Sequence, residues 1–327
     1  MIGKELRLIT RPAGLPVVDD LALVDVEVPE PEPGQVLVRN SHLSVDPGIL
    51  LKMKDWSGFD MPTYLLDAPL WSDGVGEVVE SRHPDFTPGD TVWHRSAWCD
   101  HTVAAGENFL RIDGQRYPLL SHHLSFGDVA YVATALADIQ PGEVVWVSSA
   151  AGAVGSIAGQ LARLRGARVV GSVGGPLKAQ RVLTELGFDH AVDYRSGLHS
   201  QFDALGLTAA VDVSIDTVGG DHLEAAIDVL RPEGRIILCG QTAQLRSGDE
   251  RGPTNWMRLI GKRLQLRPVF TFDHPDLLEA YHEEFPGLVR DGRVRLLQTV
   301  VDGLENGLDA ILAQIRGDHV GKVVLRL

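Results

Sequence analysis

The chain has 327 residues, 44% of them hydrophobic and 23% charged, so it is long enough for two domains with sizeable cores. Its formal net charge of -14 argues against nucleic acid or an anionic membrane surface as a partner, since either would require a basic face. The two cysteines, Cys99 and Cys239, lie far apart and fit neither a disulfide framework nor a metal site. Because the sequence also shows no signal-like apolar segment and no apolar run of membrane-spanning length, we expect a cytoplasmic protein without a membrane partner.

The first third of the chain has the pattern of short β-strands. Apolar and β-branched runs recur between turn residues, and prolines at 29, 31 and 33 and the pair Pro88-Gly89 separate some of them. The expected strands cover residues 6–9, 24–28, 35–38, 74–80, 90–93 and 99–104. This pattern predicts a small β-barrel or sandwich.

From about residue 121 the pattern changes to helices and strands in alternation. Nearly continuous apolar strands are expected at residues 144–147, 168–173, 191–194, 209–216 and 235–240, with helices between them. Strands that are apolar on both faces predict a buried parallel sheet. The tail adds a strand at 296–301, a helix at 308–315 and a last strand at 321–325.

A glycine turn lies between the first strand of this second part and the helix that follows it. The turn reads Ala150-Ala151-Gly152-Ala153-Val154-Gly155. Gly152 would let the backbone approach a pyrophosphate, and Gly155 would let the helix pack close to the strand. The N-terminus of that helix offers unpaired N–H groups and a partial positive charge to phosphates. Strand, turn and helix in this order predict a dinucleotide site.

Lys178 indicates which dinucleotide is bound. It follows the glycine turn by roughly twenty residues, where an NAD-binding chain carries an acidic residue for the ribose hydroxyls. Pro176 suits the first position of a helix, so Lys178 falls in its first turn, where the helix dipole disfavours a cation. A ribose 2′-phosphate would compensate, with Tyr194 and Arg181 as possible further contacts. We therefore expect NADPH as the cofactor.

The sequence resembles the zinc-independent medium-chain dehydrogenase/reductases, in particular the group of prostaglandin reductases and alkenal double-bond reductases. The segments that carry the resemblance are residues 35–40, 43–47, 74–81, 150–160, 170–178, 218–220 and 321–324. The resemblance implies an α/β protein with a GroES-like β-barrel catalytic domain, residues 1–120 and 292–327. It also implies a Rossmann domain with a doubly wound parallel sheet, residues 121–291, and a homodimer.

The resemblance further implies the roles of individual residues. The pyrophosphate, the 2′-phosphate and the nicotinamide would be bound by Gly152, Ala153, Val154, Gly155, Gly175, Lys178, Tyr194, Cys239, Gly240 and a strand Phe270-Thr271-Phe272. Thr217 and His319 stand at cofactor positions where the family usually has asparagine. Other departures, at Gly48, Asp128, Val129, Asp273 and His274, fall on the substrate side and leave the substrate class less defined than the cofactor.

The ligand sets of the zinc-dependent relatives are missing from the sequence. Those relatives need a thiolate and an imidazole near residue 46 and near Gly74, and four closely spaced cysteines elsewhere. Asp46 precedes Pro47 and is expected to fix a turn, so we expect no metal. Reduction of a conjugated double bond does not require a Lewis acid, because hydride goes to the β-carbon and hydrogen-bond donors stabilise the enolate. The expected substrate is an α,β-unsaturated ketone or aldehyde.

Tyr64 and Tyr131 are the candidate catalytic donors, because both match tyrosines of the family. Either phenol could instead pack its ring and donate to a backbone carbonyl. His94, His101 and His274 could titrate near neutral pH, although an isolated histidine is usually structural. Trp56 and Trp71 flank Tyr64 and could form an apolar wall for the substrate.

Two other functions remain open on the sequence. One is a quinone oxidoreductase of the same superfamily. The other is a cyclase or binding protein that keeps the dinucleotide fold without a redox role. Oxidation of NADPH with enones, with quinones or with neither acceptor separates the three functions.

Overall fold

The computed structural model describes residues 1–54, 62–248 and 252–327. The chain divides into two compact units. The first unit comprises Met1–Leu124 and Gln298–Leu327, and the second comprises Ser125–Leu297. The domain boundaries expected from the sequence, near residues 120 and 292, remain a prediction.

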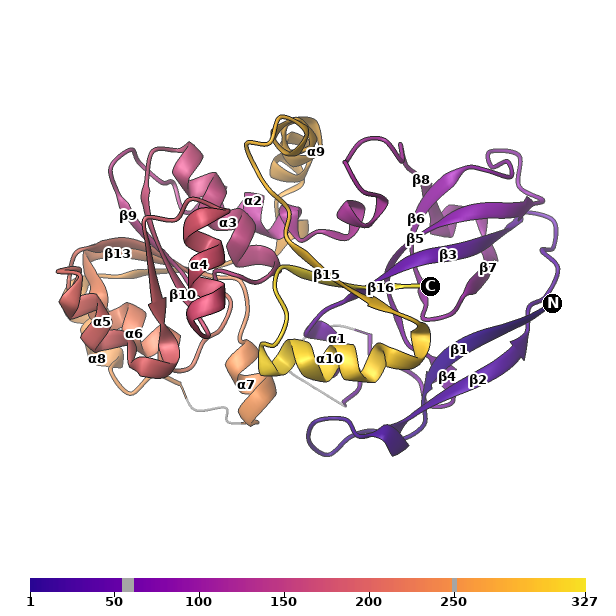
Figure 1. Cartoon of the computed structure of the whole chain (residues 1–327), viewed down its shortest axis with the longest axis horizontal. Helices are drawn as coiled ribbons and strands as arrows, with labels where there is room; N and C mark the ends of the chain where they lie inside the picture. Colours follow the sequence, from indigo (N-terminus) through magenta and orange to yellow (C-terminus); the bar gives the residue numbers. More distant parts are fainter. Residues whose placement is uncertain (55–61, 249–251) are drawn as a thin grey trace. The chain divides into compact units, whose positions relative to one another are not determined.

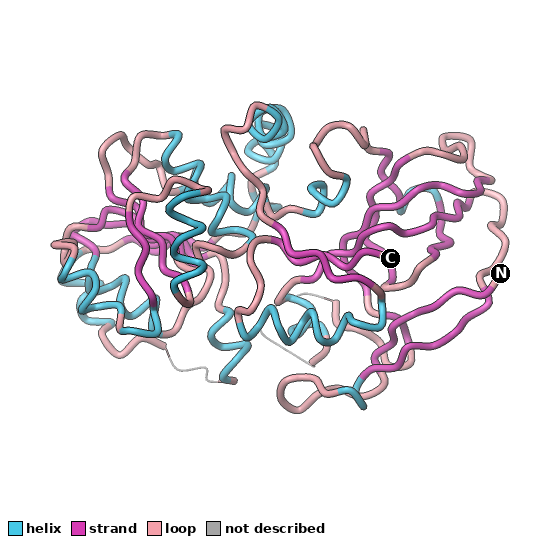
Figure 2. Tube along the Cα trace, viewed as in Figure 1, coloured by secondary structure: helices cyan, strands magenta, loops and turns pink. Residues whose placement is uncertain are grey.

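The first unit is built mainly of antiparallel strands (Figure 2). A small sheet pairs β1 (Ile2–Leu8) with β2 (Leu21–Glu27) and β4 (Ala68–Pro69). The larger sheet has the order β15-β16-β3-β5-β6-β8, and β7 also pairs with β3. Its strands are β3 (Gln35–Val45), β5 (Trp71–Ser81), β6 (Thr91–Ala97), β7 (His101–Ala105), β8 (Phe109–Arg111), β15 (Gln298–Asp302) and β16 (Lys322–Arg326).

The described residues of the first unit also form two α-helices. They are α1 (Gly48–Lys52), directly after β3, and α10 (Gly307–Arg316), between β15 and β16. Inward-facing side chains of three strands, Val36, Val38, Val78 and Val92, pack with Phe109 into one core cluster. The C-terminal strand β16 is antiparallel to β3, so the N-terminal part and the tail of the chain share one sheet.

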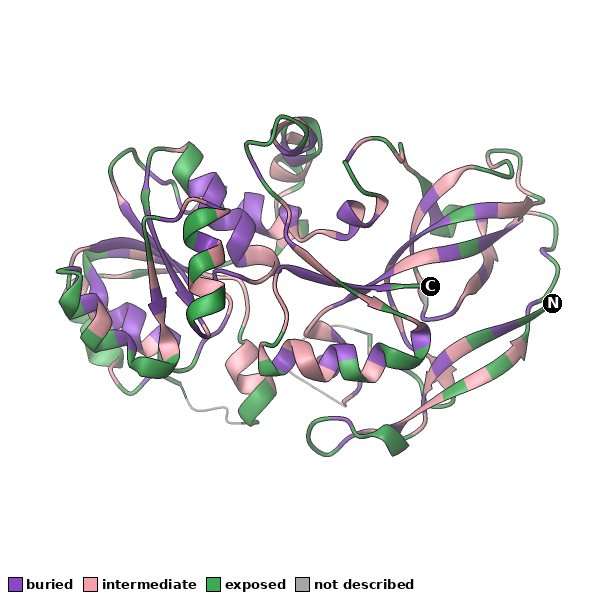
Figure 3. Ribbon diagram, viewed as in Figure 1, coloured by how far each residue is buried: buried purple, intermediate pink, exposed green. Residues whose placement is uncertain are grey.

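The second unit is a six-stranded parallel sheet in the order β11-β10-β9-β12-β13-β14. The strands are β9 (Val144–Val147), β10 (Arg168–Val173), β11 (His190–Asp193), β12 (Val211–Asp216), β13 (Leu230–Leu238) and β14 (Gln265–Pro268). All residues of β9 and β12 are buried, as Figure 3 shows, because helices cover the sheet. The strand order reverses between β9 and β12, where ligands of open α/β sheets bind. The predicted parallel sheet is confirmed.

Eight α-helices lie among the described residues of the second unit, with α2 before the first strand and the others between or after the strands (Figure 1). They are α2 (Gly127–Leu136), α3 (Ala153–Leu164), α4 (Pro176–Thr184), α5 (Leu198–Ala204), α6 (Asp221–Val229), α7 (Thr242–Ser247), α8 (Trp256–Lys262) and α9 (Pro275–Arg290). Trp146 of β9 is fully buried between the sheet and α5, where its ring meets Phe202 edge to face at 4.8 Å. Truncation of such a buried aromatic ring costs about 3 to 5 kcal/mol.

The predicted strand Phe270-Thr271-Phe272 is wrong. Strand β14 ends at Pro268, and Thr271–Asp273 form a short 3-10 helix. Val269 makes the last backbone hydrogen bond to β13, through the Leu238 carbonyl, and local bonds from Asp273 and His274 then close the turn. The local bonds replace the ladder, and the rings of Phe270 and Phe272 stay 54% and 64% exposed.

Candidate functional site

The glycine turn connects β9 to α3 in the predicted order. Gly152 caps α3, and its N–H donates to the Ser149 carbonyl at 2.7 Å. A Cβ on Gly155 would lie 2.4 Å from that carbonyl oxygen, so the close approach of helix and turn excludes any side chain. The first N–H groups of a helix have no intrahelical acceptor, which leaves those of Ala153, Val154 and Gly155 suited to an anion.

A buried carboxylate fixes the loop beside this turn. Asp216 ends β12 and is 1% exposed. It accepts a hydrogen bond from the Ser148 hydroxyl at 2.7 Å and from the N–H groups of Val218 and Gly219. The same hydroxyl accepts the Thr217 N–H at 2.8 Å. The sequence interpretation missed Asp216, although an acid at a strand end before a Val-Gly-Gly turn is a signal that could have found it.

Thr217, Cys239 and Gly240 lie together at the carboxyl ends of β12 and β13. The Cys239 N–H donates to the Asp216 carbonyl at 2.7 Å, and a Cβ on Gly240 would lie 3.3 Å from the Thr217 carbonyl oxygen. Burial, with the charge of Asp216 as a smaller cause, raises the pKa of the Cys239 thiol. This thiol is therefore protonated at neutral pH and is not activated as a nucleophile.

The stretch around Lys178 has the predicted local structure. Gly175 has a φ of +103°, a conformation that favours glycine, and Pro176 begins α4. Lys178 is half-buried in the first turn of that helix. Arg181 instead donates to Glu185 at 2.6 and 3.0 Å, so it is engaged within its own helix. Its suggested role as a phosphate contact would require that ion pair to break.

Tyr194 lies at the centre of a cluster that the sequence interpretation found only in part. The guanidinium groups of Arg246 and Arg195 interact with its hydroxyl. Burial raises the pKa of the phenol, but the two guanidinium groups lower it by more, so the pKa lies below its ordinary value. A Cβ on Gly174 would lie 3.1 Å from both the Arg195 guanidinium and the Tyr194 hydroxyl. The adjacent basic residue at 195 is visible in the sequence, whereas no local pattern connects Arg246 with Tyr194.

The contacts described within each unit do not place the remaining cofactor positions in this cluster. Phe270, Thr271 and Phe272 lie beyond the end of β14, as described above. His319 is half-buried in the first unit, before β16. The roles of these four residues stay predictions.

Tyr64 belongs to the first unit and is completely buried. Its hydroxyl donates to the Trp71 carbonyl at 2.8 Å, and its ring meets the Trp71 ring edge to face at 5.4 Å. Burial and the charge of Asp46 raise the pKa of the phenol well above its ordinary value. The Lys52 ammonium lies 4.2 Å from the centre of the Trp71 ring. Trp56, expected on the same wall, lies outside the described residues.

Tyr131 belongs to α2 in the second unit, and its hydroxyl donates to Glu284 of α9 at 2.7 Å. Burial and the bonded carboxylate raise the pKa of Tyr131 to about 12. Both candidate catalytic tyrosines therefore donate to internal acceptors. A catalytic role requires either hydroxyl to exchange its acceptor for the substrate.

The three histidines considered above occupy different environments. His94 is fully buried, with its Nε2 2.9 Å from the Asn40 side-chain oxygen, and burial lowers its pKa to about 4. His274 caps α9. His101 pairs through Nδ1 with Asp100 at 3.0 Å. His94 thus has the properties of a structural histidine.

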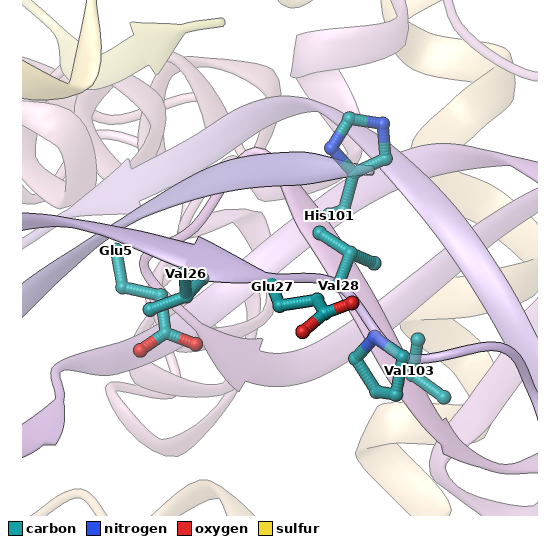
Figure 4. Close-up of a pocket in the computed structure, with 7 residues that line it drawn as sticks. Glu5, Val26, Glu27, Val28, His101 and Val103 are labelled. Atoms are coloured by element: carbon teal, nitrogen blue, oxygen red, sulfur yellow. The ribbon is translucent and has the colours of Figure 1, made fainter.

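A cavity of about 210 Å³ lies in the first unit (Figure 4). Glu5, Val26, Glu27, Val28, Pro29, His101 and Val103 line it. Two of its polar groups are already paired, since Glu5 binds Arg7 at 2.8 Å and His101 binds Asp100. None of the predicted cofactor positions lines this cavity.

Residues 4–112 match a family described as the N-terminal domain of oxidoreductase, and residues 153–290 match one described as zinc-binding dehydrogenase. Despite that description, the residues described in the structure bring no three His, Cys, Asp or Glu side chains together to hold a metal ion. The expected absence of a metal remains a prediction. Across the same described residues, no helix combines the length and apolar character that a membrane crossing requires.

Full-length relatives extend these matches. The NADPH-dependent curcumin reductase of Escherichia coli (strain K12) is 31% identical, over 98% of this chain and 95% of that protein. The (+)-pulegone reductase of Mentha piperita is also 31% identical, over 94% and 93%. The crystal structure of CurA in complex with NADPH from Vibrio vulnificus has a TM-score of 0.91 at 28% identity, covering 99% of this chain and 98% of that chain. These matches confirm the predicted fold class, and the chain belongs to the zinc-independent medium-chain dehydrogenase/reductases, the group of the curcumin, pulegone, alkenal and prostaglandin reductases.

Proposed function

We propose that the protein is an NADPH-dependent reductase of activated carbon-carbon double bonds in α,β-unsaturated ketones or aldehydes. The observation that carries this proposal is the pairing of a glycine turn at a helix N-terminus with the basic cluster around Tyr194. The first feature suits a pyrophosphate, and the second suits the additional phosphate of NADPH. Relatives named as curcumin, pulegone and 2-alkenal reductases support the substrate class.

Close packing requires glycine at two positions of the expected cofactor site. An added Cβ on Gly155 would lie 2.4 Å from the Ser149 carbonyl oxygen, and one on Gly174 would lie 3.1 Å from the Arg195 guanidinium and the Tyr194 ring and hydroxyl. Gly152 through Gly155 would bind the pyrophosphate, and Lys178 with Tyr194 would bind the 2′-phosphate. Thr217, Cys239 and Gly240 would line the nicotinamide. Bound NADPH would supply the hydride for the β-carbon of the substrate.

The protein's own contribution after hydride arrival is to stabilise the enolate and to protonate the α-carbon. Tyr64 is the first candidate donor and Tyr131 the second. A phenol whose pKa is raised keeps its proton through neutral pH and can donate it when negative charge develops nearby. Lys52, close to the Tyr64 and Trp71 rings, adds a positive charge that favours an anion on that side of the first unit.

A direct test follows NADPH oxidation across enals, enones and quinones. We expect turnover with enones or enals, deuterium from labelled NADPH at the β-carbon, solvent hydrogen at the α-carbon and an intact carbonyl. Faster turnover with quinones would favour a quinone oxidoreductase. No turnover with any acceptor would favour a cyclase or binding protein. Deuterium on a carbinol carbon would mean carbonyl reduction and would overturn the proposed reaction.

We also infer a cytoplasmic homodimer that uses no metal. Cys99 and Cys239, both among the described residues, form no disulfide, which suits a reducing compartment. An exposed apolar face on α8, next to the edge strand β14, is suited to a second copy of the chain. Elemental analysis of the purified protein should find no stoichiometric zinc, and chelation should leave activity unchanged. A mole of zinc retained per chain would contradict the metal-free assignment.

A further inference from the structure

Arg195 and Arg246 converge on one phenol in a protein whose net charge is -14. Both interact with the Tyr194 hydroxyl, and the Arg195 guanidinium also lies 5.9 Å from the centre of the Tyr194 ring. Both arginines are exposed. Across residues 1–54, 62–248 and 252–327, neither forms an ion pair, in contrast to Arg181 with Glu185 in the neighbouring helix α4. Two guanidinium groups that share a neutral acceptor retain donors for an anion.

The backbone at this point packs directly against Arg195. The turn at Gly174 and Gly175 has no side chains, and their added Cβ atoms would lie 3.1 and 3.4 Å from Arg195 guanidinium nitrogens. Lys178 follows within one helical turn. Two guanidinium groups and a phenol with a lowered pKa thus gather at a turn that has no side chains of its own. A phosphate monoester, with its two charges and several acceptor oxygens, matches such a donor set better than the neutral ribose hydroxyls of NADH.

Arg246 comes from a different part of the fold than the other members of the cluster. It lies on α7, which follows β13 and Gly240, whereas Lys178 and Tyr194 follow β10 and β11. The start of α7 is hydrogen-bonded to the loop after β12, where Thr217 would line the nicotinamide. The Thr242 N–H donates to the Thr217 carbonyl at 3.3 Å, and the Ala243 N–H donates to the Val218 carbonyl at 2.9 Å. A ligand that binds Arg246 therefore also fixes α7 against that loop.

We propose that Arg246 is a cofactor-specificity residue of this chain, which binds the 2′-phosphate of NADPH together with Arg195 and thereby orders α7. The inference rests on the proposed function, since it assumes NADPH as the bound cofactor. It adds two residues to the phosphate site, and one of them lies more than fifty residues from the others in the sequence.

The test measures dissociation constants without any substrate, by quenching of tryptophan fluorescence, for NADPH, NADH and 2′,5′-ADP. Arg246→Gln should weaken binding of NADPH and of 2′,5′-ADP by ten- to a hundredfold and change NADH binding by less than twofold. Arg195→Gln should have a smaller effect of the same kind. Arg246→Lys should restore part of the lost affinity, because it returns a charge without the planar fork. Arg168→Gln, which removes an exposed positive charge at the start of β10, is the matched control and should change neither constant.

The outcomes separate this inference from the proposed function. Unmutated protein that binds NADPH and NADH equally would overturn the cofactor assignment itself. Protein that prefers NADPH while Arg246→Gln keeps the whole preference would overturn only the role of Arg246. An equal loss of affinity for NADPH and NADH in Arg246→Gln would also overturn it, since Arg246 would then support α7 without contacting the 2′-phosphate.

Discussion

The Tyr64 side chain combines a completely buried ring with a hydroxyl that already donates to the Trp71 carbonyl. Such a phenol is well placed to stabilise the fold, and it becomes a proton donor only when the substrate replaces that carbonyl as acceptor. Its raised pKa keeps it protonated across the neutral range. Removal of the hydroxyl would lower the stability of the fold in the structural role and would lower kcat in the catalytic role.

Tyr64→Phe tests the role of this hydroxyl. If Tyr64 protonates the enolate, kcat should fall ten- to a thousandfold and the Kd for NADPH should stay nearly unchanged, because the phenol acts after charge develops. Steady-state kinetics and a binding titration measure the two quantities. Tyr131→Phe serves as the comparison. Unchanged kcat with a lower melting temperature would make Tyr64 a structural residue and move the search to Tyr131 or to water.

His94 makes stability depend on pH. Burial lowers its pKa to about 4, against an ordinary value of 6.5, so the unfolded chain takes up this proton before the folded one does. The stabilising contribution is complete above pH 6.5 and is lost progressively as the pH falls towards 4, at about 1.4 kcal/mol per pH unit. His94→Gln removes the titrating group and keeps a donor for Asn40.

Urea unfolding at several pH values measures this effect. Between pH 6.5 and 4.5, the unfolding free energy of His94→Gln should fall less steeply than that of the unmutated protein, by about 1 kcal/mol per pH unit. His190→Gln, at an exposed position, is the control and should keep the original slope. Identical slopes for all three proteins would show that His94 does not govern acid sensitivity.

At the scale of elements, helix α3 depends on the absence of a side chain at Gly155. Its packing against the turn leaves 2.4 Å between a Cβ and the Ser149 carbonyl oxygen, so Gly155→Ala must displace the helix N-terminus. We expect a loss of about 1 to 3 kcal/mol in unfolding free energy and at least tenfold weaker NADPH binding. Chemical denaturation and a fluorescence titration provide the measurements.

Gly287→Ala in α9 is the matched helical control. A Cβ there meets no atom within 4 Å, so the substitution should leave NADPH binding intact and stabilise the helix by about 0.5 to 1 kcal/mol. If Gly155→Ala behaved like this control, the close approach between turn and helix would not be required for the cofactor.

At the scale of the whole molecule, three large exposed apolar side chains of the second unit belong to α8, which directly precedes the edge strand β14 in the chain. Trp256, Met257 and Ile260 of α8 are 47%, 76% and 71% exposed, and β14 is the edge strand. An edge strand beside an apolar helix face is a suitable surface for a second copy of the chain.

The double variant Met257→Glu, Ile260→Glu places two like charges on that face. We expect it to shift the protein from dimer to monomer in light scattering at micromolar concentration, because charges are depleted in interface cores. Val18→Glu changes an equally exposed position of the first unit, 74% exposed, and should leave the dimer intact. A double variant that stays dimeric would exclude this face as the interface.

The sequence by itself determined the features that depend on local spacing. Continuous apolar strands between helices predicted the parallel sheet, the glycine turn predicted the start of α3, and Pro176 placed Lys178 in the first turn of α4. Each of these depends on residues within about one helical turn or one strand, where backbone sterics and burial act directly. The domain boundaries and the catalytic roles of Tyr64 and Tyr131 remain predictions.

Only the tertiary structure decided which distant groups meet. The interaction of Arg246 with Tyr194, the bond from Ser148 to Asp216 and the donation from Tyr131 to Glu284 join residues 52, 68 and 153 positions apart. The same applies to Phe270 and Phe272, which the family resemblance placed in a strand although the ladder ends with Val269. The conformation of these two residues depended on whether a neighbouring strand offered further hydrogen bonds. Sequence spacing does not contain that information, because such bonds form between segments that only folding brings together.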